Sequence, residues 1–155
     1  MARPKPGSFV HIEFASSDPG RTRKFLEDVF GWEFQSIPGM DYHVYTTPLG
    51  PGGAIMPPTP ERPGGVLNYI LSEDLDADVR KVADAGGTVL VRREEIPGVG
   101  WWALFEDPTG IVLALYQPRF AESGPVARFR SSPAPRRRTH GRRPARRRGK
   151  ARPGM

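Results

Sequence analysis

The chain contains two copies of one pattern, and this internal duplication constrains the fold more than any other feature. Each copy opens with an apolar strand and continues into an amphipathic helix that ends at glycine: VHIEFASSDPGRTRKFLEDVFGWEFQ from Val10, and LNYILSEDLDADVRKVADAGGTVLV from Leu67. Farther along, the turns TPLG and DPTG each precede another apolar stretch. A repeat of about sixty residues predicts two similar units that bury their apolar faces together.

Hydrophobic periodicity predicts the order β-α-β-β-β in each half. In the first half we expect a helix from the N-cap pair Asp18-Pro19 to Gly31, and strands over 9–15, 33–36, 42–47 and 52–56. In the second half we expect a helix from Leu75 to Gly86, and strands over 66–71, 88–91, 101–106 and 111–117. The predicted organisation is an N-terminal arm (1–8), a domain over 9–118 with modules 9–57 and 66–117 joined by a linker (58–65), and a tail (119–155).

Charge separates the body from the tail. Residues 1–117 carry 10 Lys and Arg against 16 Asp and Glu, whereas residues 118–155 carry 13 against one. The Arg/Pro-rich tail lacks the apolar residues that a core needs, so we expect it to be disordered and to bind polyanions weakly and non-specifically. The chain has no cysteine and no apolar run long enough for a signal peptide or a membrane span. We therefore expect a cytoplasmic protein that does not insert into membranes.

The segments VHIEFASSD, FLEDVFGWEF, GGAIMP, AGGTVL, EIPGVG and FEDPTGIVLALYQP resemble the vicinal oxygen chelate superfamily, which includes glyoxalase I, bleomycin-binding proteins and extradiol dioxygenases. The resemblance covers residues 8–118 and is strongest to a bacterial branch of predicted lactoylglutathione-lyase-related proteins. It implies an α+β fold in which two tandem βαβββ modules form a curved, cup-shaped mixed sheet with the helices outside. It does not imply one reaction, because this fold hosts several chemistries and also plain sequestration.

The metal enzymes of this superfamily place ligands in the first and last strands of a module. Carried over by position, these places are His11, Ala54, Asn68 and Ala114. Only His11 is a usual ligand, since alanine offers no donor atom and an asparagine amide is a weak one. We therefore expect no cofactor. A divalent metal at an incomplete site, completed by water and Asn68, is the alternative.

Residues two apart in a strand share a face, and this rule selects the side chains that line the cup. Starting from His11 it includes Glu13, and it places His43 and Tyr45 on the opposite face. The predicted cavity is apolar and aromatic with one polar corner. Its predicted lining is Tyr42, Val44, Asn68, Ile70, Trp102, Leu104, Ala114 and Tyr116.

Three functions remain open at this level. The favoured one is binding of a small, partly apolar organic molecule in the cup without the family metal. The second is a lyase or isomerase in which Glu13 orients His11 as a general base for a proton beside a carbonyl, or which uses the incomplete metal site. The third is an interaction protein that the basic tail tethers to polyanions. The cavity is expected within one chain or across a homodimer, which would cover exposed sheet edges.

Overall fold

The computed structural model describes residues 3–60, 62 and 64–120. The first module comprises β1 (Phe9–Ala15), α1 (Pro19–Phe30), β2 (Glu33–Ser36), β3 (His43–Thr46) and β4 (Gly53–Met56). The second comprises β5 (Gly65–Leu71), α2 (Leu75–Asp84), β6 (Thr88–Ile96), β7 (Gly100–Glu106) and β8 (Val112–Pro118). The repeated β-α-β-β-β order that the sequence predicts is confirmed. The tail is predicted to be disordered and to bind polyanions. Residues 121–155 of this tail lie outside the described residues.

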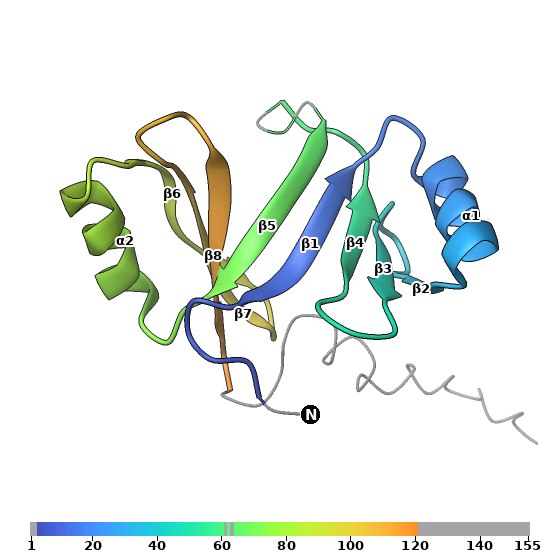
Figure 1. Cartoon of the computed structure of the whole chain (residues 1–155), viewed down its shortest axis with the longest axis horizontal. Helices are drawn as coiled ribbons and strands as arrows, with labels where there is room; N and C mark the ends of the chain where they lie inside the picture. The colour runs from blue at the N-terminus through green and yellow to red at the C-terminus, as the bar shows by residue number, and fades with distance from the viewer. Residues whose placement is uncertain (1–2, 61, 63, 121–155) are drawn as a thin grey trace, which may run out of the picture.

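All eight strands form one sheet in the order β2-β3-β4-β1-β5-β8-β7-β6. Within each module the first strand pairs in parallel with the last, β1 with β4 and β5 with β8. The two modules join at the centre, where β1 and β5 run antiparallel. The sheet curves, and α1 and α2 lie outside it on opposite flanks (Figure 1). The fold is therefore the predicted α+β fold with a curved mixed sheet.

Each helix begins at an aspartate N-cap. The Asp18 side chain accepts a hydrogen bond from the backbone N–H of Arg21 at 2.9 Å, and the Asp74 side chain accepts one from Ala77 at 2.9 Å. These bonds satisfy donors that the first helical turn leaves unpaired. Gly31 ends α1 in the left-handed conformation with φ 65°, which a side chain would disfavour.

Strand β6 is longer than predicted, since it continues past Val91 to Ile96. Its pairing with β7 shifts register between Val89 and Val91 and again between Val91 and Glu94. Such irregularities break the alternation of apolar and polar residues, so periodicity alone ends the strand too early. Glu94 and Glu95 therefore belong to this strand.

The sheet has an apolar core on each face of the second module. One core lies on the concave face and contains Leu67, Tyr69, Val99, Leu104, Ala114 and Tyr116. The other lies under α2 and contains Leu75, Val79, Ala103 and Leu115. No helix among the described residues combines the length and the apolar character that a membrane crossing requires.

The central strands of the first module approach one another very closely. A Cβ atom added to Gly53 would lie 1.7 Å from the carbonyl oxygen of Ile12 in β1. The same carbonyl accepts a 2.9 Å hydrogen bond from the Tyr45 hydroxyl. Tyr45 is 1% exposed and stacks on Trp32, with ring centroids 4.7 Å apart. Glycine at position 53 therefore lets β4 pack against β1 at the base of the site.

Candidate functional site

The concave face of the sheet holds a cavity of about 580 Å³. Most of its wall is aliphatic or aromatic, and one corner is polar. A volume of this size accommodates a drug-sized organic molecule. The lining residues are His11, Glu13, Ile37, Met40, Tyr42, Met56, Thr59, Arg62, Tyr69, Val91, Glu94, Ile96, Val99, Trp102, Leu104 and Tyr116.

Six predicted site residues lie in this wall. They are His11, Glu13, Tyr42, Trp102, Leu104 and Tyr116. Trp102 faces the cavity, whereas its neighbour Trp101 packs beside the core under α2. Alternation along β7 thus places the two tryptophans on opposite faces of the strand.

Two residues that the sequence predicts in the lining do not line the cavity. Asn68 pairs with Ile12, and Ile70 packs against the core under α2, so neither lines the cavity. Tyr69 pairs with His11 instead and shares its face, with the two rings in a T-shaped contact at 5.3 Å. The prediction aligned the repeats on His11 and Asn68, which shifts the second strand by one residue. A shift of one residue exchanges the two faces of a strand.

The helix N-caps give the correct alignment of the repeats. Asp18 and Asp74 are 56 residues apart, and in β1 and β5 the third and fifth residues are the buried ones. His11 therefore corresponds to Leu67, not to Asn68. The predicted equivalence of Ala54 and Ala114 is confirmed, because Ala54 pairs with the fifth residue of β1 and Ala114 with the fifth residue of β5.

Val44 and Ala114 lie on the concave side but under the cavity surface. Val44 pairs with Ala54, which in turn pairs with Glu13, and Ala114 pairs with both Tyr69 and Leu104. Both are buried, with 4% and 0% exposure, and neither is a lining residue. They support the floor and would not contact a bound molecule.

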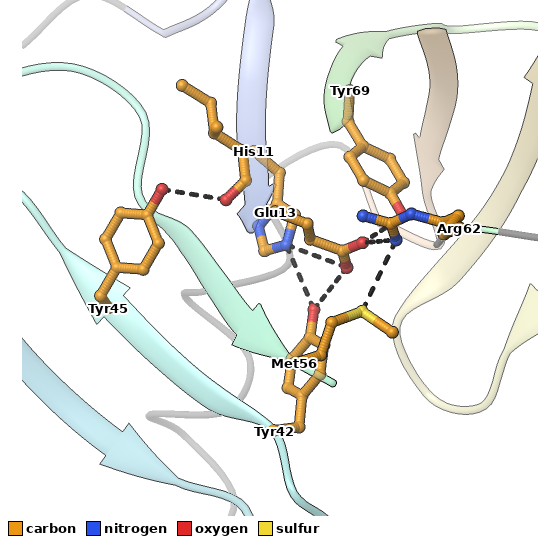
Figure 2. Close-up of polar contacts among 8 residues, drawn as sticks. His11, Glu13, Tyr42, Tyr45, Met56, Arg62 and Tyr69 are labelled. Atoms are coloured by element: carbon orange, nitrogen blue, oxygen red, sulfur yellow. Dashed lines mark hydrogen bonds and ion pairs between the residues drawn. The ribbon is translucent and has the colours of Figure 1, made fainter. Parts of the chain in front are cut away.

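Glu13 is the centre of the polar corner, and its carboxylate is surrounded by donors (Figure 2). The Tyr42 hydroxyl donates to Oε1 at 2.7 Å, and the Tyr69 hydroxyl donates to Oε2 at 2.9 Å. Nη1 of Arg62 also donates to Oε2 and forms an ion pair with it. Nε2 of His11 lies 3.5 Å from Oε1. A carboxylate has about four acceptor positions, and the donors of Tyr42, Tyr69 and Arg62 occupy three of them.

These contacts hold the network in one charge state. Burial by itself raises the pKa of the Glu13 carboxyl, but the hydrogen bond and charge of His11, the charge of Arg62 and the hydrogen bond from Tyr42 together lower the pKa to about 2. Burial, followed by the negative charge of Glu13, raises the pKa of Tyr42 and of Tyr69 well above the usual value of a phenol. At neutral pH Glu13 is therefore ionised and both phenols are protonated.

The network also determines which nitrogen of His11 carries hydrogen. The Tyr42 hydroxyl donates its proton to Glu13, so at 3.2 Å its oxygen can only accept from Nε2 of His11. Nε2 is consequently protonated. Among the described residues, Nδ1 of His11 is buried and has no hydrogen-bond partner. The nitrogen that could accept a proton thus has no access to the cavity.

Arg62 comes from the connector between the modules. The connector turns at Thr59 and Arg62, whose backbones exchange hydrogen bonds of 2.9 Å, and this turn directs the guanidinium toward Glu13. Nη1 also lies 3.5 Å from the sulfur of Met56. The side chain of Arg62 is 14% exposed. The connector therefore contributes one wall of the cavity as well as linking the two modules.

The donor set of this corner does not fit the metal of the superfamily. Glu13 already accepts from the two phenols and from Arg62, which is the cation beside it. His11 directs Nε2 at Tyr42, while Leu67 and Ala114 offer no ligand atoms. In the described part of the chain no group of three or more His, Asp and Glu side chains could hold a metal ion. A divalent cation would need at least three such ligands and would be repelled by Arg62.

Several lining residues were missed by sequence reasoning. Tyr69 could have been found by aligning the repeats on their N-caps, and Met56 by alternation from Ala54. Arg62 and Thr59 lie in a connector without periodicity, so no pattern reveals them. Glu94 is exposed and also borders the cavity.

Residues 8–115 match the Glyoxalase/Bleomycin resistance protein/Dioxygenase superfamily, and the chain belongs to this family. It is 31% identical over 116 residues to Putative glyoxylase CFP32 of Mycobacterium bovis, a match that covers 72% of this chain and 44% of that protein. It is 27% identical over 144 residues to Anthracycline biosynthesis protein DnrV of Streptomyces peucetius, covering 81% of this chain and 52% of that protein. The chain thus spans about half the length of these relatives.

Solved structures share the fold at low sequence identity. Methylmalonyl-CoA epimerase of Mycobacterium tuberculosis is 16% identical, with a TM-score of 0.58 over 77% of this chain and 93% of that one. The hypothetical protein BH1468 of Bacillus halodurans is 12% identical, with a TM-score of 0.60 over 77% of this chain and all of that one. These similarities establish the architecture and not the reaction.

Proposed function

We propose that this protein binds a small, largely apolar organic molecule in the cup of its sheet, without a metal ion. The observation that carries the proposal is the cavity itself, whose wall is largely aliphatic and aromatic around one polar corner. The rings of Trp102 and Tyr69 give this wall its aromatic character. The Glu13 network is preorganised, because Tyr42, Tyr69 and Arg62 already donate to the carboxylate.

Binding in the cup can be tested with 2-ethylnaphthalene, which has an aromatic body and no polar group. We expect saturable binding to the full chain by isothermal titration calorimetry. A Leu104→Trp variant should weaken binding at least tenfold, because Leu104 is 4% exposed and lines the cavity, so an indole there would fill the space. Leu49→Trp is the matched control, since Leu49 is 77% exposed and is not a lining residue.

A second blocking variant, Met40→Trp, keeps the test valid if Leu104→Trp fails to fold. Met40 lines the mouth of the cavity and is 62% exposed, so Met40→Trp should narrow the mouth without disturbing the core. The proposal predicts weaker binding for both blocking variants and unchanged binding for Leu49→Trp. Equal binding by all four proteins would place the probe elsewhere and refute the proposal.

A second candidate function is a lyase or isomerase reaction that uses His11. The observation in its favour is that His11 is 3% exposed, lines the cavity and belongs to the hydrogen-bonded network of Tyr42 and Glu13. Binding is better supported, because Nε2 already carries hydrogen and Nδ1 has no access to the cavity. Proton abstraction would require the other tautomer, with the hydrogen on Nδ1.

Exchange of a hydrogen of the bound ketone for solvent deuterium distinguishes the two functions. If His11 abstracts a proton beside a carbonyl, the protein should catalyse incorporation of deuterium from solvent into a ketone that binds in the cup, and His11→Ala should abolish this exchange while binding persists. No exchange above the solvent rate, with binding intact, would exclude this chemistry for the bound ketone.

The tail remains a separate proposal. Residues 119–155 carry the clustered arginines, and the electrostatic argument predicts weak polyanion binding that falls as salt rises. Deleting residues 121–155 should remove this binding and leave binding of 2-ethylnaphthalene unchanged. Polyanion binding that survives the deletion would contradict the proposal.

A further inference from the structure

Most hydrogen-bond donors of the polar corner already have an acceptor within the protein, and only some are available to a ligand. The inference drawn from this difference rests on the proposed binding function. Both phenolic protons, from Tyr42 and Tyr69, point at Glu13. The Nε2 hydrogen of His11 points at Tyr42. The carboxylate of Glu13 already accepts from Tyr42, Tyr69 and Arg62. The phenols and His11 therefore offer no free hydrogen to an acceptor on the ligand.

The connector supplies the donors that remain. A guanidinium has five N–H groups; Nη1 of Arg62 makes the hydrogen bonds to Glu13 and Met56, and the guanidinium also interacts with the Tyr69 hydroxyl. Arg62 lines the cavity, and the side chain of Thr59 lines it alongside. The Arg62 side chain keeps 14% exposure beside a largely apolar cavity, so an acceptor on a ligand can replace water at its remaining N–H groups.

We propose that the polar head of the ligand is an uncharged hydrogen-bond acceptor, such as a ketone or quinone carbonyl, and that Arg62 is the specificity-determining residue that holds it. The aromatic wall of Tyr69 and Trp102, whose ring centroids are 6.5 Å apart, holds the body of the same molecule. The ligand class is then an aromatic carbonyl compound.

The charges already present at the polar corner favour a ligand whose polar head is uncharged. Among the lining residues Glu13 and Glu94 are acidic and Arg62 is basic, and the charge of Arg62 is already balanced by Glu13. A carboxylate head would compete with Glu13 for Arg62 in a buried setting, and displacing one buried charge leaves it unpaired. An ammonium head would lie beside the guanidinium and be repelled. A carbonyl accepts from Arg62 without disturbing the ion pair.

Four probes with the same ring system test this selectivity. They are 2-acetylnaphthalene, 2-ethylnaphthalene, 2-naphthoate and 2-(aminomethyl)naphthalene, with an acceptor, apolar, anionic and cationic head respectively. Hydrogen bonds to charged groups are strong enough that the acetyl probe should bind about tenfold more tightly than the ethyl probe. The naphthoate and aminomethyl probes should bind no more tightly than the ethyl probe.

Substitution of Arg62 tests whether this residue is responsible. Arg62→Met should bring the acetyl and ethyl probes to equal affinity, while Arg92→Met, at an exposed arginine that does not line the cavity, should preserve the tenfold ratio. If Arg62→Met fails to fold because Glu13 loses its partner, the double variant Glu13→Gln with Arg62→Met removes the unpaired charge. The acetyl preference of this double variant is then compared with that of Glu13→Gln alone.

The outcomes separate the two proposals. Loss of the acetyl preference only when Arg62 is replaced supports the assignment. A preference that survives this replacement, tightest binding of the anionic or cationic probe, or equal binding of the acetyl and ethyl probes to the unmodified protein would overturn it, while binding in the cup would stand. If no probe binds in the cup, the proposed function fails and this inference fails with it.

Discussion

The ionised, buried Glu13 makes the stability of the fold depend on acid in a specific pH window. The network lowers the pKa of this carboxyl from 4.5 to about 2 on folding. A carboxyl with a lowered pKa stabilises the folded state above its unfolded pKa and loses that contribution as the pH falls toward its folded pKa. The dependence on Glu13 should therefore appear between about pH 4.5 and pH 2.

The size of the effect follows from the two pKa values. Each pKa unit corresponds to about 1.4 kcal/mol, so the whole shift is worth on the order of 3 kcal/mol at neutral pH. About 2 kcal/mol of this should be lost by pH 3, where the unfolded carboxyl is mostly protonated and the folded one is mostly ionised. Other acids titrate in the same range, so a variant is needed to isolate the contribution of Glu13.

Urea unfolding of the unmodified protein and of Glu13→Gln at pH 7 and pH 3 measures this contribution. The free energy of unfolding should differ between the two proteins by about 2 kcal/mol more at pH 7 than at pH 3. Glu94→Gln is the control, because Glu94 is an exposed glutamate on the rim of the same cavity. A difference between the unmodified protein and Glu13→Gln that is the same at both pH values would refute the reasoning.

Three further predictions concern the groups around this network. Absorbance titration should show that Tyr42, Tyr45 and Tyr69 ionise above the usual range of a phenol, because their pKa values are raised, and stability should fall as the pH rises past about 10. A transition of all tyrosines near pH 10 in the folded state would contradict this. Tyr42→Phe should lower the free energy of unfolding, measured with urea, by about 1 to 3 kcal/mol, because it removes a donor from the buried charge of Glu13. Tyr45→Phe should lower it less, because Tyr45 donates to a neutral carbonyl. Gly53→Ala should prevent folding as judged by circular dichroism, whereas Gly64→Ala, where an added Cβ meets nothing within 4 Å, should leave the melting temperature unchanged.

Local patterns in the sequence predict the architecture well. The aspartate N-caps, the glycines after the helices and the repeated strand pattern each act within a few residues, and the structure keeps both helices and all eight strands. The largest error in strand length is at β6, where register shifts in the pairing with β7 hide the alternation.

Alternation also predicts much of the candidate site, but it needs the correct starting residue. From His11 it selects Glu13, and within β7 it selects Trp102 and Leu104, all of which line the cavity. In β5 the predicted register is shifted by one residue, so alternation selects Asn68 and Ile70. In the structure Tyr69 pairs with His11 and lies on the cavity face. The N-cap spacing in the sequence contains the information that would have prevented this error.

The two βαβββ modules, their strands and helices, and a cup lined by a histidine and a glutamate can be predicted from local patterns, because these features depend on residues close together in the chain. The surroundings of Glu13 depend on contacts between distant segments. Tyr42, Tyr69 and Arg62 come from three separate segments, and they meet at one carboxylate because β1 and β5 pair at the centre of the sheet and the connector turns over their ends. Charge balance and the direction of hydrogen bonds depend on distances between such segments, which no local pattern encodes.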